Sequence, residues 1–172
     1  MKLVVSVIIV ITLELLGCCK SDNDQEPCFL EDVQSPINID CYLTKDLDTT
    51  RLFIQGLWTL LQEERRQRGK PIEFLTPKNQ GYSSTLELKG ETAKFYRCGQ
   101  LEDSFKFSVV RLKEISGTDF PEDEDPVLVL YNLETGLRIS HVPLKICNSY
   151  LVLQYQYVSS IVGEKTWKRI PN

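Results

Sequence analysis

The sequence has few of the residues that catalytic and metal sites need. Its 172 residues include one histidine, His141, and no two cysteines stand in Cys-x-x-Cys spacing. We expect no metal site, because structural zinc is usually held by closely spaced cysteines and histidines. No Gly-x-Ser-x-Gly motif is present, and strand geometry would place Ser140 and His141 on opposite faces. The sequence therefore predicts a protein that is not an enzyme and needs no cofactor.

An excess of positive charge is also lacking. The chain has 20 lysines and arginines against 24 aspartates and glutamates, for a net charge of -4. Nucleic-acid-binding proteins need clustered lysine and arginine, so nucleic acid is not an expected partner. The acidic segment 119–126 lacks the Asp-x-Asp-x-Asp-Gly pattern of calcium loops. Its two prolines predict an extended, solvated loop instead.

The N-terminus carries an export signal. Lys2 precedes an apolar run over residues 3–16 that is too short for a stable membrane span. The run ends in Leu-Leu-Gly-Cys at Cys18, which resembles the lipobox of bacterial lipoproteins. The resemblance implies a signal peptide over residues 1–17 and acylation of Cys18 with palmitate-type chains, which would anchor the protein to a membrane. The alternative is an ordinary secretory signal.

A polar, acidic stretch follows at residues 20–26 and predicts a flexible tether within residues 18–49. This stretch is similar to the surface-export signal of Bacteroidetes-type lipoproteins. The similarity implies a lipid-anchored outer-membrane protein displayed on the cell surface. An anchor that faces the periplasm is the alternative.

Six cysteines are present, and the exported environment favours disulfides. Lipidation removes one cysteine from the count. If Cys19 stays free, the remaining cysteines allow three connectivities. We favour one bond between Cys28 and Cys41 and a second between Cys98 and Cys147, and the other pairings stay open.

From residue 53 onward, β-rich runs alternate with turn signals, and no long segment shows a helical apolar stripe. Tight turns are predicted at Gly90 and at residues 132–136. Sequential hairpins of this kind predict an all-β meander that closes into a barrel, with a sandwich as the alternative. Pro143 should mark a bulge or an early strand end. The expected strands cover residues 53–64, 83–89, 92–98, 104–113, 127–132, 137–146, 150–158 and 163–170.

The ends of this region carry a family resemblance. Gly56-Leu57-Trp58 in the first strand is similar to the Gly-x-Trp opening of lipocalin and calycin barrels, and Trp167-Lys168-Arg169 is similar to their final strand. The run at residues 83–92 looks like the lipocalin-like domains of Bacteroidetes lipoproteins. The resemblance implies an eight-stranded antiparallel up-and-down barrel over residues 50–172. In it, Arg169 would pack on Trp58 beside Gly56 and close one end.

Two features suggest ligand binding. The cations Arg65, Arg66 and Arg68 would lie near the open mouth of such a barrel and favour an anionic ligand, unless they form a solvated hairpin tip. Aromatic residues would line the interior. The candidates are Trp58, Phe95, Phe105, Phe107, Tyr155 and Tyr157.

These observations lead to two functional hypotheses. The first is a monomeric, non-catalytic, lipid-anchored envelope protein that binds a small hydrophobic or amphipathic ligand. The alternative is a protein-interaction or inhibitor module displayed on the cell surface.

Overall fold

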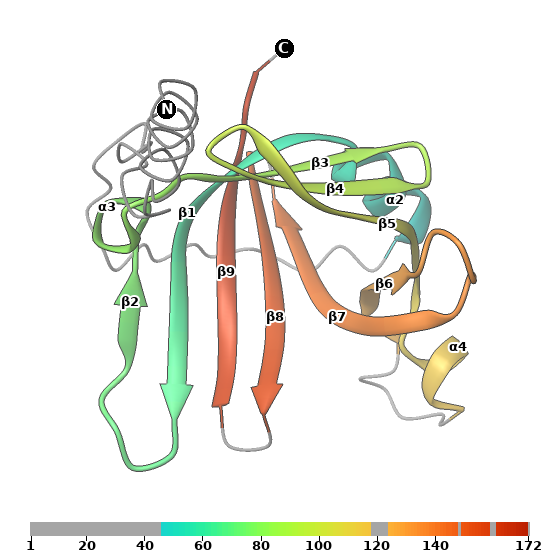
Figure 1. Ribbon diagram of the computed structural model, residues 1–172. Coiled ribbons are helices and arrows are strands. Elements are labelled where there is room, and N and C mark those ends of the chain that lie inside the picture. Colours follow the sequence, from blue (N-terminus) through green and yellow to red (C-terminus); the bar gives the residue numbers. More distant parts are fainter. Residues whose placement is uncertain (1–45, 118–123, 148, 159–160, 172) are drawn as a thin grey trace, which may run out of the picture.

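The computed structural model describes residues 46–117, 124–147, 149–158 and 161–171 (Figure 1). The predicted export signal, the lipidation site Cys18 and the predicted tether up to residue 45 lie outside the described residues. The elements are α2 (Leu47–Ile54), β1 (Gly56–Gln67), β2 (Glu73–Leu75), α3 (Pro77–Gln80), β3 (Ser84–Lys89), β4 (Thr92–Arg97), β5 (Gln100–Arg111), α4 (Lys113–Ser116), β6 (Pro126–Tyr131), β7 (Arg138–Cys147), β8 (Tyr150–Val158) and β9 (Ile161–Arg169).

Eight of these strands form a closed antiparallel barrel in the order β1-β3-β4-β5-β6-β7-β8-β9, and β1 closes it by pairing with β9. This confirms the predicted all-β, up-and-down barrel, and the architecture is compatible with a lipocalin-like fold. The short strand β2 was not predicted. It pairs with the far half of β1, where Glu63 lies opposite Leu75.

Both predicted hairpin turns are present. Gly90 connects β3 to β4 with φ of 60°. Between β6 and β7, the side chain of Asn132 accepts hydrogen bonds from the backbone N–H groups of Glu134 and Thr135, each at 2.9 Å. Gly136 completes this turn with φ of 67°, a value that glycine adopts without a steric penalty.

The helix α2 precedes the barrel and corrects two predicted boundaries. Its N-cap is Asp46, whose carboxylate accepts from the backbone N–H of Thr49 at 3.1 Å. Thr50 and Ile54 are completely buried against the barrel. The predicted tether over 18–49 therefore includes residues 47–49, which belong to α2. The predicted first strand begins too early, because Phe53 and Ile54 are the last residues of α2.

At the end next to α2, apolar side chains fill the interior of the barrel. Inward-facing positions from every barrel strand contribute, in keeping with the alternation of strands. The half of the barrel next to α2 is thus a packed core. It contains Ile54, Trp58, Leu60, Leu86, Leu88, Ala93, Phe107, Val109, Leu128, Leu130, Val142, Leu144, Ile146, Leu151, Leu153 and Trp167.

The prediction that Pro143 marks a bulge or an early strand end is wrong. β7 neither ends nor bulges at this proline but continues to Cys147. Instead, β7 changes partner here: Pro143 is paired with Val127 of β6, and pairing with β8 begins at Leu144. Because Pro143 is not paired with β8, its missing N–H removes no hydrogen bond from that ladder.

Candidate functional site

One end of the barrel is closed by a contact between the first and last strands. The guanidinium carbon of Arg169 lies 4.3 Å from the centre of the Trp58 ring. Its Nη1 donates to the carbonyl of Gln55 at 2.7 Å and its Nη2 donates to the carbonyl of Phe53. The Nε1 of Trp58 donates to the carbonyl of Ile54 at 2.9 Å. The contact that the family resemblance implies is present.

Gly56 makes room for this contact. Its φ is 140°, and a Cβ built on it would lie 2.8 Å from Nη1 of Arg169. Trp58 is fully buried beneath the guanidinium, so it belongs to the core. The prediction that Trp58 contacts a ligand is not supported by this position, and the role of the Gly56, Trp58 and Arg169 set is to close the barrel.

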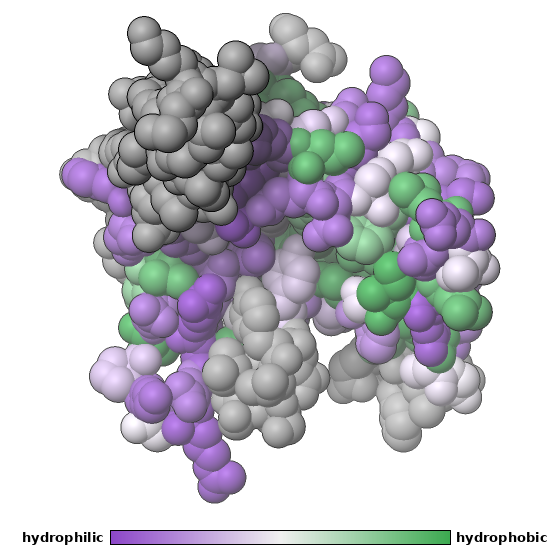
Figure 2. Space-filling model, viewed as in Figure 1, coloured by the Kyte–Doolittle hydropathy of each residue, from purple (hydrophilic) through white to green (hydrophobic). Residues whose placement is uncertain are grey.

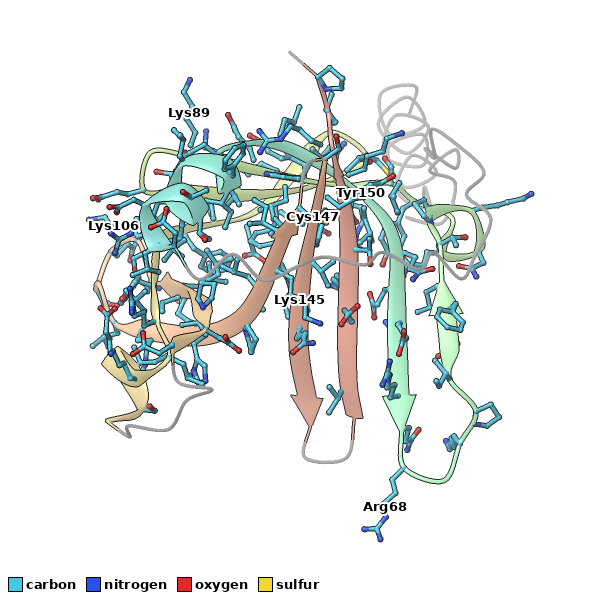
Figure 3. All side chains as sticks on the ribbon, turned by 180° about the vertical axis from the view of Figure 1, so that it is seen from behind. Arg68, Lys89, Lys106, Lys145, Cys147 and Tyr150 are labelled. Atoms are coloured by element: carbon cyan, nitrogen blue, oxygen red, sulfur yellow. The ribbon has the colours of Figure 1, made fainter. Side chains whose placement is uncertain are left out.

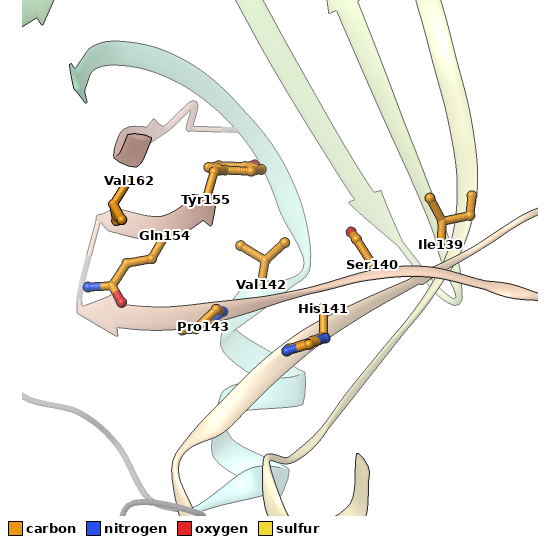
Figure 4. A pocket seen from close by; sticks show the side chains of 8 residues that line it. All are labelled: Ile139, Ser140, His141, Val142, Pro143, Gln154, Tyr155 and Val162. Atoms are coloured by element: carbon orange, nitrogen blue, oxygen red, sulfur yellow. The ribbon is translucent and has the colours of Figure 1, made fainter. Parts of the chain in front are cut away.

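The barrel wall opens between β7 and β8. These strands pair only from Leu144 opposite Leu153 to Cys147 opposite Tyr150. Beyond this ladder, residues 138–143 and 154–158 diverge, and a pocket of about 490 Å³ lies between them (Figure 4). We call it the seam pocket. Its lining residues are Ile139, Ser140, His141, Val142, Pro143, Gln154, Tyr155 and Val162.

The seam pocket borders the edge of β7, so residues on both faces of the barrel wall line it. Val142 is buried and faces the interior, whereas His141 and Pro143 are exposed. Figure 4 shows Ser140 and Val142 on one side of β7 and His141 and Pro143 on the other. Alternate residues of a strand point to opposite faces, so a pocket lined by consecutive residues must border the edge of β7.

The lining of the seam pocket is largely apolar. It contains no aspartate, glutamate, lysine or arginine. Ile139 and Val162 are half exposed at the rim, at 52% and 51%. Hydrogen-bonding capacity comes from Ser140, His141 and Gln154. The size lies within the roughly 300–1,000 Å³ that ligand pockets occupy, so this lining suits a small molecule with an apolar body.

A group of paired charges lies beside the seam pocket. Lys165 Nζ is 5.0 Å from the ring of Tyr155 and 3.6 Å from Oε2 of Glu63. The carboxylate of Glu63 is almost fully buried and also pairs with Arg65. Burial of a carboxylate is tolerated when cations of this kind compensate it. Glu63 and Lys165 also line a second cavity of about 100 Å³, which we call the inner cavity.

The three predicted cations do not gather at one entrance. β1 continues to Gln67, so consecutive residues alternate between its faces. Arg65 pairs with Glu63, and Arg66 pairs with Glu64. Arg68 extends from the tip of the β1–β2 hairpin (Figure 3). Because Arg65 and Arg66 are paired with carboxylates, the expected ring of free cations around a mouth is not supported and stays a prediction.

The predicted aromatic residues separate into different environments. Phe107 is in the core, and Phe105 packs edge-on against Phe95 at 5.9 Å between ring centres. Phe95 also lines the inner cavity. Tyr155 is the predicted aromatic that borders the seam pocket, and the side chain of Tyr157 lies outside the described residues.

Sequence reasoning did not assign the β7 residues of the seam pocket to a binding site. Ser140 and His141 were considered only as a catalytic pair, and the structure places their side chains on opposite sides of β7 (Figure 4). The available signal was Pro143, which is unusual within a strand. Up to this residue β7 is paired with β6, and after it β7 is paired with β8.

The predicted disulfides are not confirmed. Cys98 and Cys147 are both disulfide-bonded, but no bond that joins these two to each other is seen in the described part of the chain. Cys28 and Cys41 lie outside the described residues. The connectivity therefore stays a prediction.

The described end of the acidic segment is tied to the barrel by ion pairs. Glu124 accepts hydrogen bonds from Lys113 and Arg111, which hold the pKa of its carboxyl below the ordinary value. Across the residues described, no group of three or more histidine, cysteine, aspartate or glutamate side chains could hold a metal ion. No helix within those residues has the length and apolar character needed to span a membrane.

Comparison with known proteins adds no relative. No family model, no curated protein and no solved structure matches this chain.

Proposed function

We propose that this chain is a non-catalytic, lipid-anchored cell-envelope protein whose lipocalin-like barrel binds a small hydrophobic or amphipathic ligand. The observation that carries the binding proposal is the seam pocket of about 490 Å³ between β7 and β8. The inner cavity of about 100 Å³ is too small for a fatty acid or a bile acid, and the end next to α2 is packed. Of the two cavities described, the seam pocket is the one large enough for such a ligand.

The lining of the seam pocket favours a particular ligand chemistry. Val142 and Tyr155 offer apolar and aromatic surface at the inner side, and Ile139 and Val162 extend it to the outer side. No aspartate, glutamate, lysine or arginine lines the pocket, so burying an ionised group there would be costly. An apolar body that enters the seam, with any charged group left in solvent, matches these surroundings.

A thermal-shift screen tests the binding proposal. Fatty acids, bile acids and neutral sterols are the probes, and the expected result is a concentration-dependent rise in Tm for members with a slender apolar body. The absence of a shift with every probe would contradict ligand binding.

Lipid anchoring is supported by the sequence that ends at Cys18. Two or three acyl chains would hold the protein stably on a membrane, and the acidic residues that follow favour the outer membrane and its surface. Mass spectrometry of the mature N-terminus checks this proposal. It should find an acylated Cys18 as the first residue, and an unmodified residue there would refute the anchor.

A protein-interaction module is the second candidate, favoured by exposed apolar side chains on the β6–β7 hairpin. Leu133, Leu137 and Ile139 are 42%, 69% and 52% exposed. Figure 2 shows hydrophobic residues among polar ones on this side of the molecule. Exposed apolar clusters of this kind mark contact surfaces. A partner that binds the wild-type protein but not the Leu137→Glu variant would favour this candidate.

A further inference from the structure

The inner cavity is a polar site, and it shares no lining residue with the seam pocket. It lies where β1, β9, β3, β4 and the end of α3 meet. Both apolar and charged side chains line it, among them Glu63, Gln80, Arg97, Glu102, Lys165 and Trp167.

Two buried polar atoms at this cavity have no hydrogen-bond partner. Trp167 is 2% exposed, and its Nε1 donor is unpaired. The Oε1 acceptor of Gln80 is buried and unpaired as well. By contrast, the Nε1 of the other tryptophan, Trp58, donates to the carbonyl of Ile54. A buried polar atom without a partner is energetically costly, so such atoms normally have a protein, water or ligand partner.

The charged side chains around the cavity are paired, and Glu63 also pairs with Arg65, which does not line the cavity. Glu63 and Lys165 lie 3.6 Å apart, and Nε of Arg97 lies 2.8 Å from Oε1 of Glu102. The lining thus holds two carboxylates and two cations, and each carboxylate faces a cation. The two atoms without a partner are one donor and one acceptor, and neither carries a charge. The site favours a neutral group.

We propose that the inner cavity binds a small neutral polyol, such as the terminal glycosyl unit of a glycan. A hydroxyl group can accept from the indole N–H of Trp167 and can donate to the amide oxygen of Gln80, because its O–H rotates. The carboxylates and cations around the cavity offer further acceptors and donors. Phe95 supplies an apolar surface for the C–H groups of the ring. This binding does not depend on a ligand in the seam pocket.

The indole N–H groups make this proposal measurable. The chain has two tryptophans, so a ¹H–¹⁵N spectrum contains two indole signals, which Trp167→Phe assigns. Glycerol and methyl β-glucoside are the probes, with sodium acetate and methylammonium as charged comparators. We expect the polyols to shift the Trp167 signal saturably and to leave the Trp58 signal in place. The charged comparators should shift neither signal.

Three results would overturn the proposal. One is a Trp167 signal that neither polyol moves, and cross-relaxation between water and the indole N–H would then show whether the cavity holds water only. Another is a saturable shift with acetate or methylammonium. The third concerns Gln80→Leu, which removes the unpaired acceptor. This variant should weaken methyl β-glucoside binding by about tenfold, the effect of one buried hydrogen bond, and an unchanged affinity would contradict the site.

Discussion

At the scale of single residues, Arg169 joins the end of α2 to both terminal strands of the barrel. Replacing it in Arg169→Met removes the contact with Trp58 and leaves two carbonyls without their donor. We expect a loss of about 2–4 kcal/mol in the free energy of unfolding. Urea denaturation measures it, with Lys168→Met on the exposed neighbouring position as the control. Equal losses in the two variants would show that the contact contributes little.

Gly56 is the second residue on which this end of the barrel depends. An alanine there would have an unfavourable φ of 140° and a Cβ 2.8 Å from Arg169. Gly56→Ala should therefore cost about 1–3 kcal/mol of stability. Gly69→Ala is the control, because Gly69 also has a positive φ but has no atom within 4 Å of an added Cβ. Thermal unfolding should rank Gly56→Ala as the less stable variant, and the reverse order would contradict the steric argument.

Residues of the closed end could be predicted from sequence, and residues of the seam pocket could not. Gly56 and Trp58 stand together in a short motif, and Arg169 occupies a fixed place in the last strand. The lining of the seam pocket depends on where β7 exchanges β6 for β8. No local pattern specifies that exchange, and Pro143 shows only that the strand is irregular.

At the scale of elements, α2 depends on its N-cap. Hydrogen bonds from the side chain and then the backbone of Thr49 hold the pKa of Asp46 below its ordinary value of 3.8. Because the folded pKa is depressed, this stabilisation is complete above the unfolded value and is lost as the pH falls through the folded pKa. Asp46→Asn should keep the cap at neutral pH but lose this acid sensitivity. Unfolding midpoints between pH 6 and pH 2 test it, and parallel curves for the two proteins would contradict it.

The strand β8 should have two regions with different backbone protection. Residues 151–153 are paired on both sides, by β7 and β9, whereas Gln154 and the residues after it are paired with β9 alone. We expect alternate amides of 154–158 to exchange quickly with solvent, and those of 151–153 to exchange slowly. Hydrogen exchange measured by NMR gives both rates. Uniform protection along β8 would mean that the seam is closed in solution.

Short elements were the ones that sequence patterns missed. β2 has three residues and α2 has eight, too few for an alternation or an apolar stripe to stand out. The longer strands follow the predicted ranges closely, because alternating apolar positions and glycine turns agree with each other. Phe53 and Ile54 were assigned to a strand for their β propensity, but the packing of Ile54 beneath the barrel places them in α2.

At the scale of the whole molecule, the sequence predicted closure of the barrel but not what fills it. Consecutive hairpins leave β1 and β9 as the two free edges, and pairing them removes both. Whether an eight-stranded barrel is hollow or packed depends on how side chains from distant strands fit together. Here the end next to α2 is packed, and the pocket that carries the binding proposal lies in the wall between β7 and β8.

Calorimetric titration of the tightest-binding apolar probe into three proteins tests the ligand site most directly. Ser140→Phe places a ring in the seam pocket, and Ser116→Phe places one on the exposed surface of α4. The wild-type protein and Ser116→Phe should bind one equivalent with equal affinity, and Ser140→Phe should bind at least about tenfold more weakly, a loss of about 1.4 kcal/mol. Equal affinity in all three proteins would show that the seam pocket is not the ligand site.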